Sequence, residues 1–271
     1  MRRFSAEYLS QTREGMWADS RETLVDLELS TRRRTLDVGC GTGELTRVLA
    51  EESPGEVVGC DADSRLLAVA REHVPVVAGD AYRLPFADNS FDLVVCQALL
   101  INLPDPAAAL GEFARLSSDL VAAIEPNNAD VSVDSTVDRE VDLEGRVREA
   151  YLRGVETDVA LGDRVESLFE EAGLETVSTR RYIHDKQTEP PYSEAALESA
   201  ARKATGAGLE DHKPELQQGL AGRETTYDEL RGEWREMGRS VIEKIQAREY
   251  ERVERVPFDV TVGRVDGVSD N

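Results

Sequence analysis

Three glycines at alternate positions, Gly39, Gly41 and Gly43, follow a short apolar run that ends at Asp37 and Val38. Glycine is needed where a backbone turns sharply or where a ligand must approach the main chain closely. A carboxylate just before such a loop suits a ligand with an ammonium group or several hydrogen-bond donors. Glu44 stands where the dinucleotide fingerprint has its last glycine, and an acid there would repel a pyrophosphate. The spacing therefore indicates a loop for a cationic, nucleotide-like ligand.

The apolar pattern around these glycines predicts the elements that position them. Residues 35–38 form an expected strand, and Leu45, Val48 and Leu49 have helical spacing. Further strands are expected at residues 56–60, 76–78, 93–95, 120–124, 174–183 and 257–263. Ligands of open parallel sheets lie outside the carboxyl ends of the strands, where acids and glycines follow several of these runs.

The acid and the alternate glycines resemble the first motif of the class I S-adenosylmethionine-dependent methyltransferases. Residues 84–92, Leu-Pro-Phe-Ala-Asp-Asn-Ser-Phe-Asp, resemble the small-molecule, ubiquinone-biosynthesis type within that family. The resemblance covers residues 35–125. It implies an α/β fold with a doubly wound, mostly parallel, seven-stranded Rossmann-like sheet, an antiparallel last strand and, here, a helical insertion before that strand.

The resemblance also implies roles for single residues. An acid at Asp61 accepts hydrogen bonds from both ribose hydroxyls, because two vicinal donors face two carboxylate oxygens. Asp80 contacts the adenine amino group beside the small Ala81, and Gln97 lines the pocket. Arg13 and Trp17, with Tyr8, could reach the cofactor carboxylate or close the site. The expected S-adenosylmethionine-binding residues are Asp37, Gly39, Cys40, Gly41, Asp61, Ala62, Asp80, Ala81 and Gln97.

Other functions stay open on the residues alone. An acid such as Asp61 also occurs in NAD-binding proteins, although the third glycine and a Tyr-x-x-x-Lys relay are missing. The lack of an unambiguous base allows a non-catalytic S-adenosylmethionine-binding protein. Asp63 is expected to cap the following helix. A methyltransferase acting on a protein or an RNA is a further alternative.

The acceptor side is less well marked. Glu125 and Asn127 follow a strand and are candidate substrate residues, although Asn127 also suits a turn. His184 is the candidate general base, because its reference pKa lies near neutrality; the alternative is a surface histidine. Cys96 lacks the preceding proline of a cytosine-attacking cysteine and is not expected to be a nucleophile. The expected reaction is in-line displacement of the methyl group by a small-molecule acceptor, favoured by proximity and orientation.

The composition narrows the class of partner. The chain of 271 residues has 54 acidic and 32 basic residues and a net charge of -22. This charge disfavours nucleic acid, and with only Lys186, Lys203, Lys213 and Lys244 as lysines it indicates a salt-rich cytoplasm. The three cysteines fit neither a zinc pattern nor a disulfide framework, so no metal is expected. No signal peptide or membrane span is expected, and the oligomeric state is left open.

The expected organisation is a methyltransferase core with additions. A helical leader occupies residues 1–30, and the core comprises residues 31–189 and 255–265. A helical insertion at 190–254 could form a lid, and residues 266–271 form a tail. Helices are also expected across residues 130–161 and at 164–172.

Overall fold

The computed structural model describes residues 5–13, 15–17 and 20–265, except for the side chains of Tyr8, Ser10, Gln11 and Asp163. The chain divides into two compact units. The first comprises residues 1–127, 161–182 and 258–271, and the second comprises residues 128–160 and 183–257. The helical insertion expected at 190–254 thus lies in the second unit, which also includes residues 128–160.

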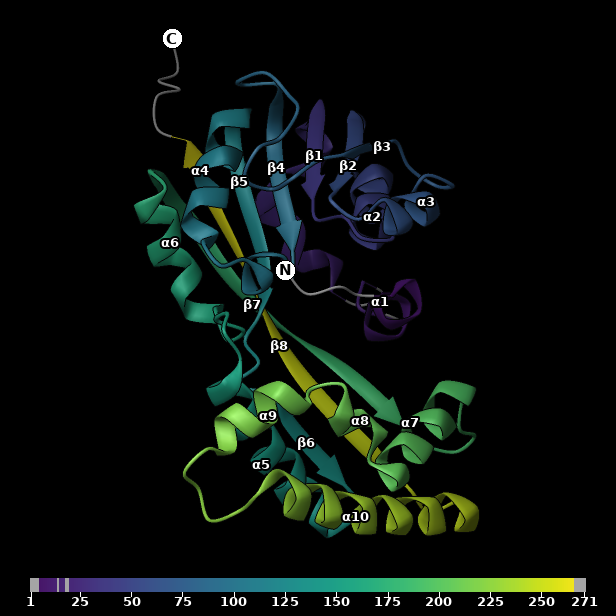
Figure 1. The fold of residues 1–271 in the computed structure, drawn as a ribbon. Coiled ribbons are helices and arrows are strands. Elements are labelled where there is room, and N and C mark those ends of the chain that lie inside the picture. The colour runs from purple at the N-terminus through teal and green to yellow at the C-terminus, as the bar shows by residue number, and fades with distance from the viewer. Residues whose placement is uncertain (1–4, 14, 18–19, 266–271) are drawn as a thin grey trace. The chain divides into compact units, whose positions relative to one another are not determined.

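The first unit holds the parallel part of the sheet (Figure 1). The strands follow the order β3-β2-β1-β4-β5-β8, and all neighbours up to β5 are parallel. These strands are β1 (Arg34–Val38), β2 (Glu56–Asp61), β3 (Val76–Ala78), β4 (Phe91–Gln97) and β5 (Ser117–Pro126). The last strand, β8 (Arg252–Val265), is antiparallel to β5, with Ile124 opposite Val260. The predicted fold class is therefore confirmed.

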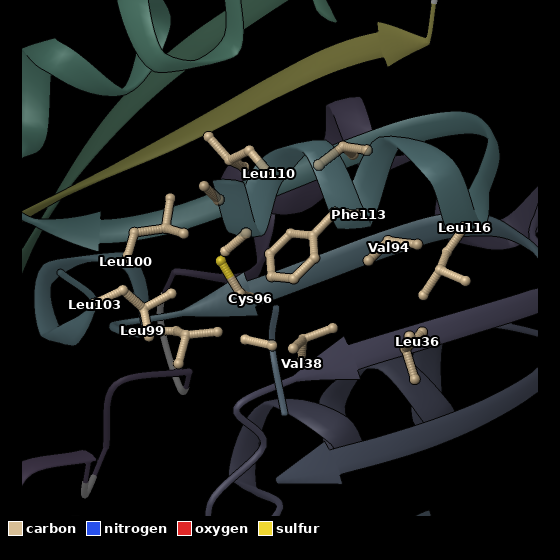
Figure 2. Packing of buried hydrophobic residues seen from close by; sticks show 14 of the residues in the cluster. Leu36, Val38, Val94, Cys96, Leu99, Leu100, Leu103, Leu110, Phe113 and Leu116 are labelled. Carbon is tan, nitrogen blue, oxygen red and sulfur yellow. The ribbon is translucent and has the colours of Figure 1, made fainter. Parts of the chain in front are cut away.

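The strands pack against helices through a continuous apolar core (Figure 2). Leu36, Val94 and Cys96 of the central strands belong to one buried cluster with Leu110 and Phe113 of α4. Helix α4 (Pro106–Leu116) starts at Asp105, whose side chain accepts a hydrogen bond from the Ala108 N–H at 3.0 Å. The other helices of this unit are α1 (Ala6–Arg13), α2 (Glu44–Glu52), α3 (Ser64–Ala70) and α6 (Val165–Glu171), with short 3₁₀ turns at Arg21–Leu27, Leu29–Thr31, Leu100–Asn102 and Gly162–Arg164.

The second unit is mainly helical. Its elements are β6 (Ser132–Ser135), α5 (Asp138–Gly154), α7 (Glu194–Thr205), α8 (Ala207–Glu210), α9 (Lys213–Leu220) and α10 (Tyr227–Ala247). Helices α5 and α9 approach closely, since a Cβ at Gly154 would lie 1.8 Å from the Glu215 carbonyl oxygen. The fully buried Glu140 is bound by Lys203 and by the Tyr250 hydroxyl, which satisfies its charge.

Several elements differ from the prediction. Strand β6 was not expected, because the charged segment at 130–161 has helical spacing; it pairs with the first part of β8. Strand β7 (Leu174–Thr188) and β8 are both longer than expected, because they pair with each other and continue from the first unit into the second. Within the described residues of the leader, one short α-helix, α1, precedes two 3₁₀ turns.

Candidate functional site

The glycine loop after β1 has the backbone that its sequence predicts. Gly39 and Gly41 have φ angles of +73° and +56°, a region that disfavours other residues. The N–H groups of Gly39 and Cys40 donate to the Cys60 carbonyl at 2.7 and 3.0 Å. A Cβ at Gly39 would lie 2.9 Å from the Leu99 side chain. The loop is thus fixed against the end of β2, and the Leu99 side chain packs directly on Gly39.

Asp37 lies below this loop and is 1% exposed. One carboxylate oxygen accepts a hydrogen bond from the Thr46 hydroxyl at 2.6 Å, and the other has no partner among the described residues. Burial raises the pKa of Asp37 to about 6. A buried carboxylate oxygen without a partner is costly, so Asp37 fits a cationic or hydrogen-bond-donating ligand.

Asp61 joins the end of β2 to the glycine loop. Its two oxygens accept hydrogen bonds from the Gly41 and Asp63 N–H groups at 2.9 and 2.8 Å. Ala62 is exposed, and Asp63 caps α3 through the Arg65 N–H, as predicted. Asp61 remains partly exposed, so its other lone pairs can accept hydroxyl donors.

Asp80 and Ala81 follow β3 at the same edge of the sheet. Asp80 is exposed and accepts a hydrogen bond from the Tyr82 N–H at 3.0 Å, while Ala81 is buried. A Cβ at Gly79 would lie 2.7 Å from the Cys60 sulfur, so this turn approaches β2 closely. The predicted roles of these residues toward adenine stay predictions.

Gln97, at the end of β4, meets the N-terminal segment. Its Nε2 lies 2.7 Å from the Met16 sulfur, and its Oε1 has no partner among the described residues. Leu9 and Arg13 of the same segment lie beside Gly41, and Arg13 also pairs with Glu44 at 3.5 Å. The segment therefore covers the glycine loop. Met16 was not predicted for the site, because nothing in its sequence position marks it; the Tyr8 side chain lies outside the described residues.

Glu125, a predicted substrate residue, is fully buried and holds the loop after β4. It accepts hydrogen bonds from the N–H groups of Leu99, Leu100 and Ile101 at 3.0, 2.9 and 3.4 Å. Burial raises its pKa to about 7. Because Leu99 also packs on Gly39, Glu125 positions the glycine loop indirectly.

The remaining acceptor-side candidates belong to different units of the chain. Asn127 is buried at the end of the first unit, where its side chain packs against Gly162. His184 lies in the second unit, on β7, and is 6% exposed. Burial lowers its pKa, which favours the neutral form that a base requires. The predicted roles of both residues toward an acceptor stay predictions.

The three cysteines are free and buried. Burial raises the pKa of the Cys96 thiol well above its usual value, so its reactive thiolate is suppressed. Across the described ranges, no helix combines the length and apolar character needed to cross a membrane.

The comparisons with known proteins match methyltransferases. A family described as a methyltransferase domain matches residues 36–119. A demethylmenaquinone methyltransferase of Lactiplantibacillus plantarum is 31% identical over 186 residues, which are 60% of this chain and 78% of the relative. One of Shouchella clausii is 29% identical over 185 residues, 60% of this chain and 79% of the relative. A solved candidate methyltransferase of Bacillus halodurans C-125 has a TM-score of 0.55 and 19% identity, with 92% of this chain and 100% of that chain covered. The last of these likenesses concerns the fold alone.

Proposed function

The chain belongs to the class I methyltransferase family and transfers a methyl group from S-adenosylmethionine to a small molecule, and from this premise we propose that its acceptor is a hydroxylated aromatic ring of the quinol class. We also propose which residues hold the methyl donor. They are Asp37, Gly39, Cys40, Gly41, Asp61, Ala62, Asp80, Ala81 and Gln97.

The observation that carries the donor site is the glycine loop with its two acids. Asp37 has a buried oxygen without a partner in the described chain, which suits a ligand carrying an ammonium group. Asp61 fixes Gly41 and keeps lone pairs for hydroxyl groups. A side chain at Gly39 would collide with Leu99, and its φ of +73° also favours glycine, so the loop keeps this backbone only with glycine there.

The donor supplies a methyl group made electrophilic by a sulfonium. A nucleophilic carbon or oxygen of the acceptor forms the new bond to that methyl carbon as the carbon–sulfur bond breaks, and one proton leaves the acceptor. Asp37 and the glycine loop would hold and orient the methyl donor. The N-terminal segment, which packs on Gly41, would exclude water from it.

The acceptor class is supported by relatives named demethylmenaquinone methyltransferases. Their matches cover 60% of this chain and 78–79% of the relatives. The net charge of -22 disfavours a nucleic-acid partner. The same charge supports work in a salt-rich cytoplasm.

Two measurements test this proposal. Calorimetric titration with S-adenosylhomocysteine in high salt should show binding, and no binding would remove the donor site. Labelled methyl transfer from S-adenosylmethionine should occur to reduced 1,4-naphthoquinone and not to an aliphatic alcohol or amine of similar size. Transfer to the aliphatic compounds alone would overturn the acceptor class.

A further inference from the structure

Three aromatic rings pack together in the first unit, and the donor site does not use them. The rings of Tyr182 and Phe258 are stacked, with centroids 5.4 Å apart and an interplanar angle of 12°. The Trp17 ring lies against Tyr182 at 5.8 Å and an angle of 43°. Trp17 is 6% exposed, Tyr182 7% and Phe258 6%. We call these residues the aromatic cluster.

Strand pairing places the aromatic cluster at the carboxyl end of the parallel sheet. Phe258 is in register with Pro126, the last residue of β5. Next to the stacked pair, Arg181 donates two hydrogen bonds to the buried Asp259, at 2.7 and 2.8 Å. This bidentate pair fixes β7 on β8, so the Tyr182 and Phe258 rings are held rigidly at the edge where ligands of such sheets bind.

The cluster also contains buried polar atoms without partners. The Trp17 Nε1 and the Tyr182 hydroxyl have no hydrogen-bond partner within the described part of the chain, and neither has the nearby Gln97 Oε1. Buried polar groups in proteins are nearly always hydrogen-bonded. The N–H of a buried tryptophan and the hydroxyl of a buried tyrosine usually have a hydrogen-bond partner as well. The two rings that carry the first two of these groups contact each other, so one ligand could supply both missing bonds.

The cluster lies beside the donor site. Met16, next to Trp17 in the chain, contacts Gln97, and Gln97 ends the strand next to β1. Arg13 of the same N-terminal segment lies beside Gly41. The N-terminal segment therefore contacts the cluster through Trp17 and the glycine loop through Leu9 and Arg13.

We propose that the aromatic cluster is the acceptor subsite, in which Tyr182 and Phe258 pack against the ring of a hydroxylated aromatic molecule. The Tyr182 hydroxyl and the Trp17 Nε1 donate hydrogen bonds to an oxygen of that ring. Trp17 belongs to the N-terminal segment and not to the sheet, so it is the ring that moves to admit the acceptor. This assignment rests on the proposed function and names the residues that select the acceptor.

The test compares Tyr182→Phe with Tyr192→Phe. Tyr182→Phe keeps the stacked ring and removes a hydroxyl that has no described partner. Its KM for reduced 1,4-naphthoquinone should rise about tenfold, the usual effect of one lost hydrogen bond. Its affinity for S-adenosylhomocysteine and its thermal midpoint should not fall. Tyr192→Phe removes a hydroxyl that bonds both the N–H and the carbonyl of Tyr250, so it should lower the thermal midpoint and leave KM unchanged.

The opposite pattern, an unchanged KM with a lowered midpoint for Tyr182→Phe, would show a purely structural tyrosine and overturn the assignment.

A second measurement uses Trp234→Phe, in which Trp17 is the only tryptophan left. Oxidised 1,4-naphthoquinone should quench its fluorescence in the presence of S-adenosylhomocysteine. Absence of quenching overturns the subsite. Quenching without any methyl transfer to the quinol by the unmodified protein overturns the proposed function and leaves the subsite standing.

Discussion

Two fully buried carboxylates, Asp37 and Glu125, differ in what their oxygens bind. Glu125 accepts hydrogen bonds from three consecutive backbone N–H groups, whereas Asp37 accepts one bond from Thr46. Burial raises the pKa of both, to about 7 and about 6. The folded state then keeps protons that the unfolded state has lost, so both groups make the free energy of unfolding fall as pH rises from about 4 to 7. Glu125 is suited to support a loop, and Asp37 to meet a ligand.

Asp37 should make donor binding depend on pH. A ligand with an ammonium group prefers the ionised carboxylate, and with a pKa of about 6 only about a tenth of Asp37 is ionised at about pH 5. The Kd for S-adenosylhomocysteine, measured by calorimetry, should therefore be about tenfold weaker there than at about pH 8.

Asp37→Asn should bind about thirtyfold more weakly, equivalent to ~2 kcal/mol for a bond to a charged group, and should lose the pH dependence. Asp88→Asn, which changes an acid that is exposed on the surface, is the control and should behave as the unmodified protein. A pH dependence that persists in Asp37→Asn would assign the titration to another group.

Glu125→Gln should destabilise the protein and loosen the donor site together. The new amide would turn an NH₂ group toward backbone N–H donors, at a cost of ~1–3 kcal/mol in the free energy of unfolding measured in urea. Glu51→Gln, an exposed residue paired with Arg21, should cost less than about 0.5 kcal/mol. Equal stability of the two variants would deny Glu125 its role in holding the Leu99 loop.

At the scale of the element, the glycine loop joins β1 to α2, and the N-terminal segment packs against this loop. Gly41 and Gly222 have similar backbone, with φ angles of +56° and +74°. A Cβ at Gly41 would lie 3.0 Å from Leu9 and 3.3 Å from Arg13, whereas one at Gly222 would meet nothing within 4 Å. Alanine at either glycine would strain the backbone, but only alanine at Gly41 would also crowd its neighbours. Comparing the two variants therefore separates the two effects.

Gly41→Ala and Gly222→Ala should each lose ~1 kcal/mol of stability, because both force alanine into the left-handed region. Only Gly41→Ala should also weaken S-adenosylhomocysteine binding, since its methyl group occupies the space over the loop. Chemical denaturation and calorimetry measure the two effects. Unchanged affinity in Gly41→Ala would show that the donor does not approach this backbone.

At the scale of the whole molecule, the dominant feature is the net charge of -22. Like charges on a folded surface repel each other, and salt screens them with a Debye length of about 10 Å at 0.1 M and 3 Å at 1 M. The thermal midpoint should rise with KCl, with most of the rise below about 1 M, where screening changes most. A rise confined to higher concentrations would indicate a general salting-out effect and contradict the electrostatic explanation.

The sequence alone determined the parallel sheet, the glycine loop and the acids at the strand ends. These features depend on local chemistry: apolar runs of strand length, glycines that permit a left-handed backbone, and acids placed directly after strands. The predicted helix cap at Asp63 is equally local and is present in the fold.

Only the tertiary structure decided what meets across the sheet. Strand β6 and the long β7 and β8 depend on pairing between distant segments, which side-chain periodicity does not record. The same holds for Glu125, whose partners are backbone groups 24 to 26 residues away, and for the contact of Tyr182 with Trp17 and Phe258. The sequence places Tyr182 within a strand. That it contacts Trp17 and Phe258, with no partner for its hydroxyl among the described residues, follows only from the pairing of β7 with β8.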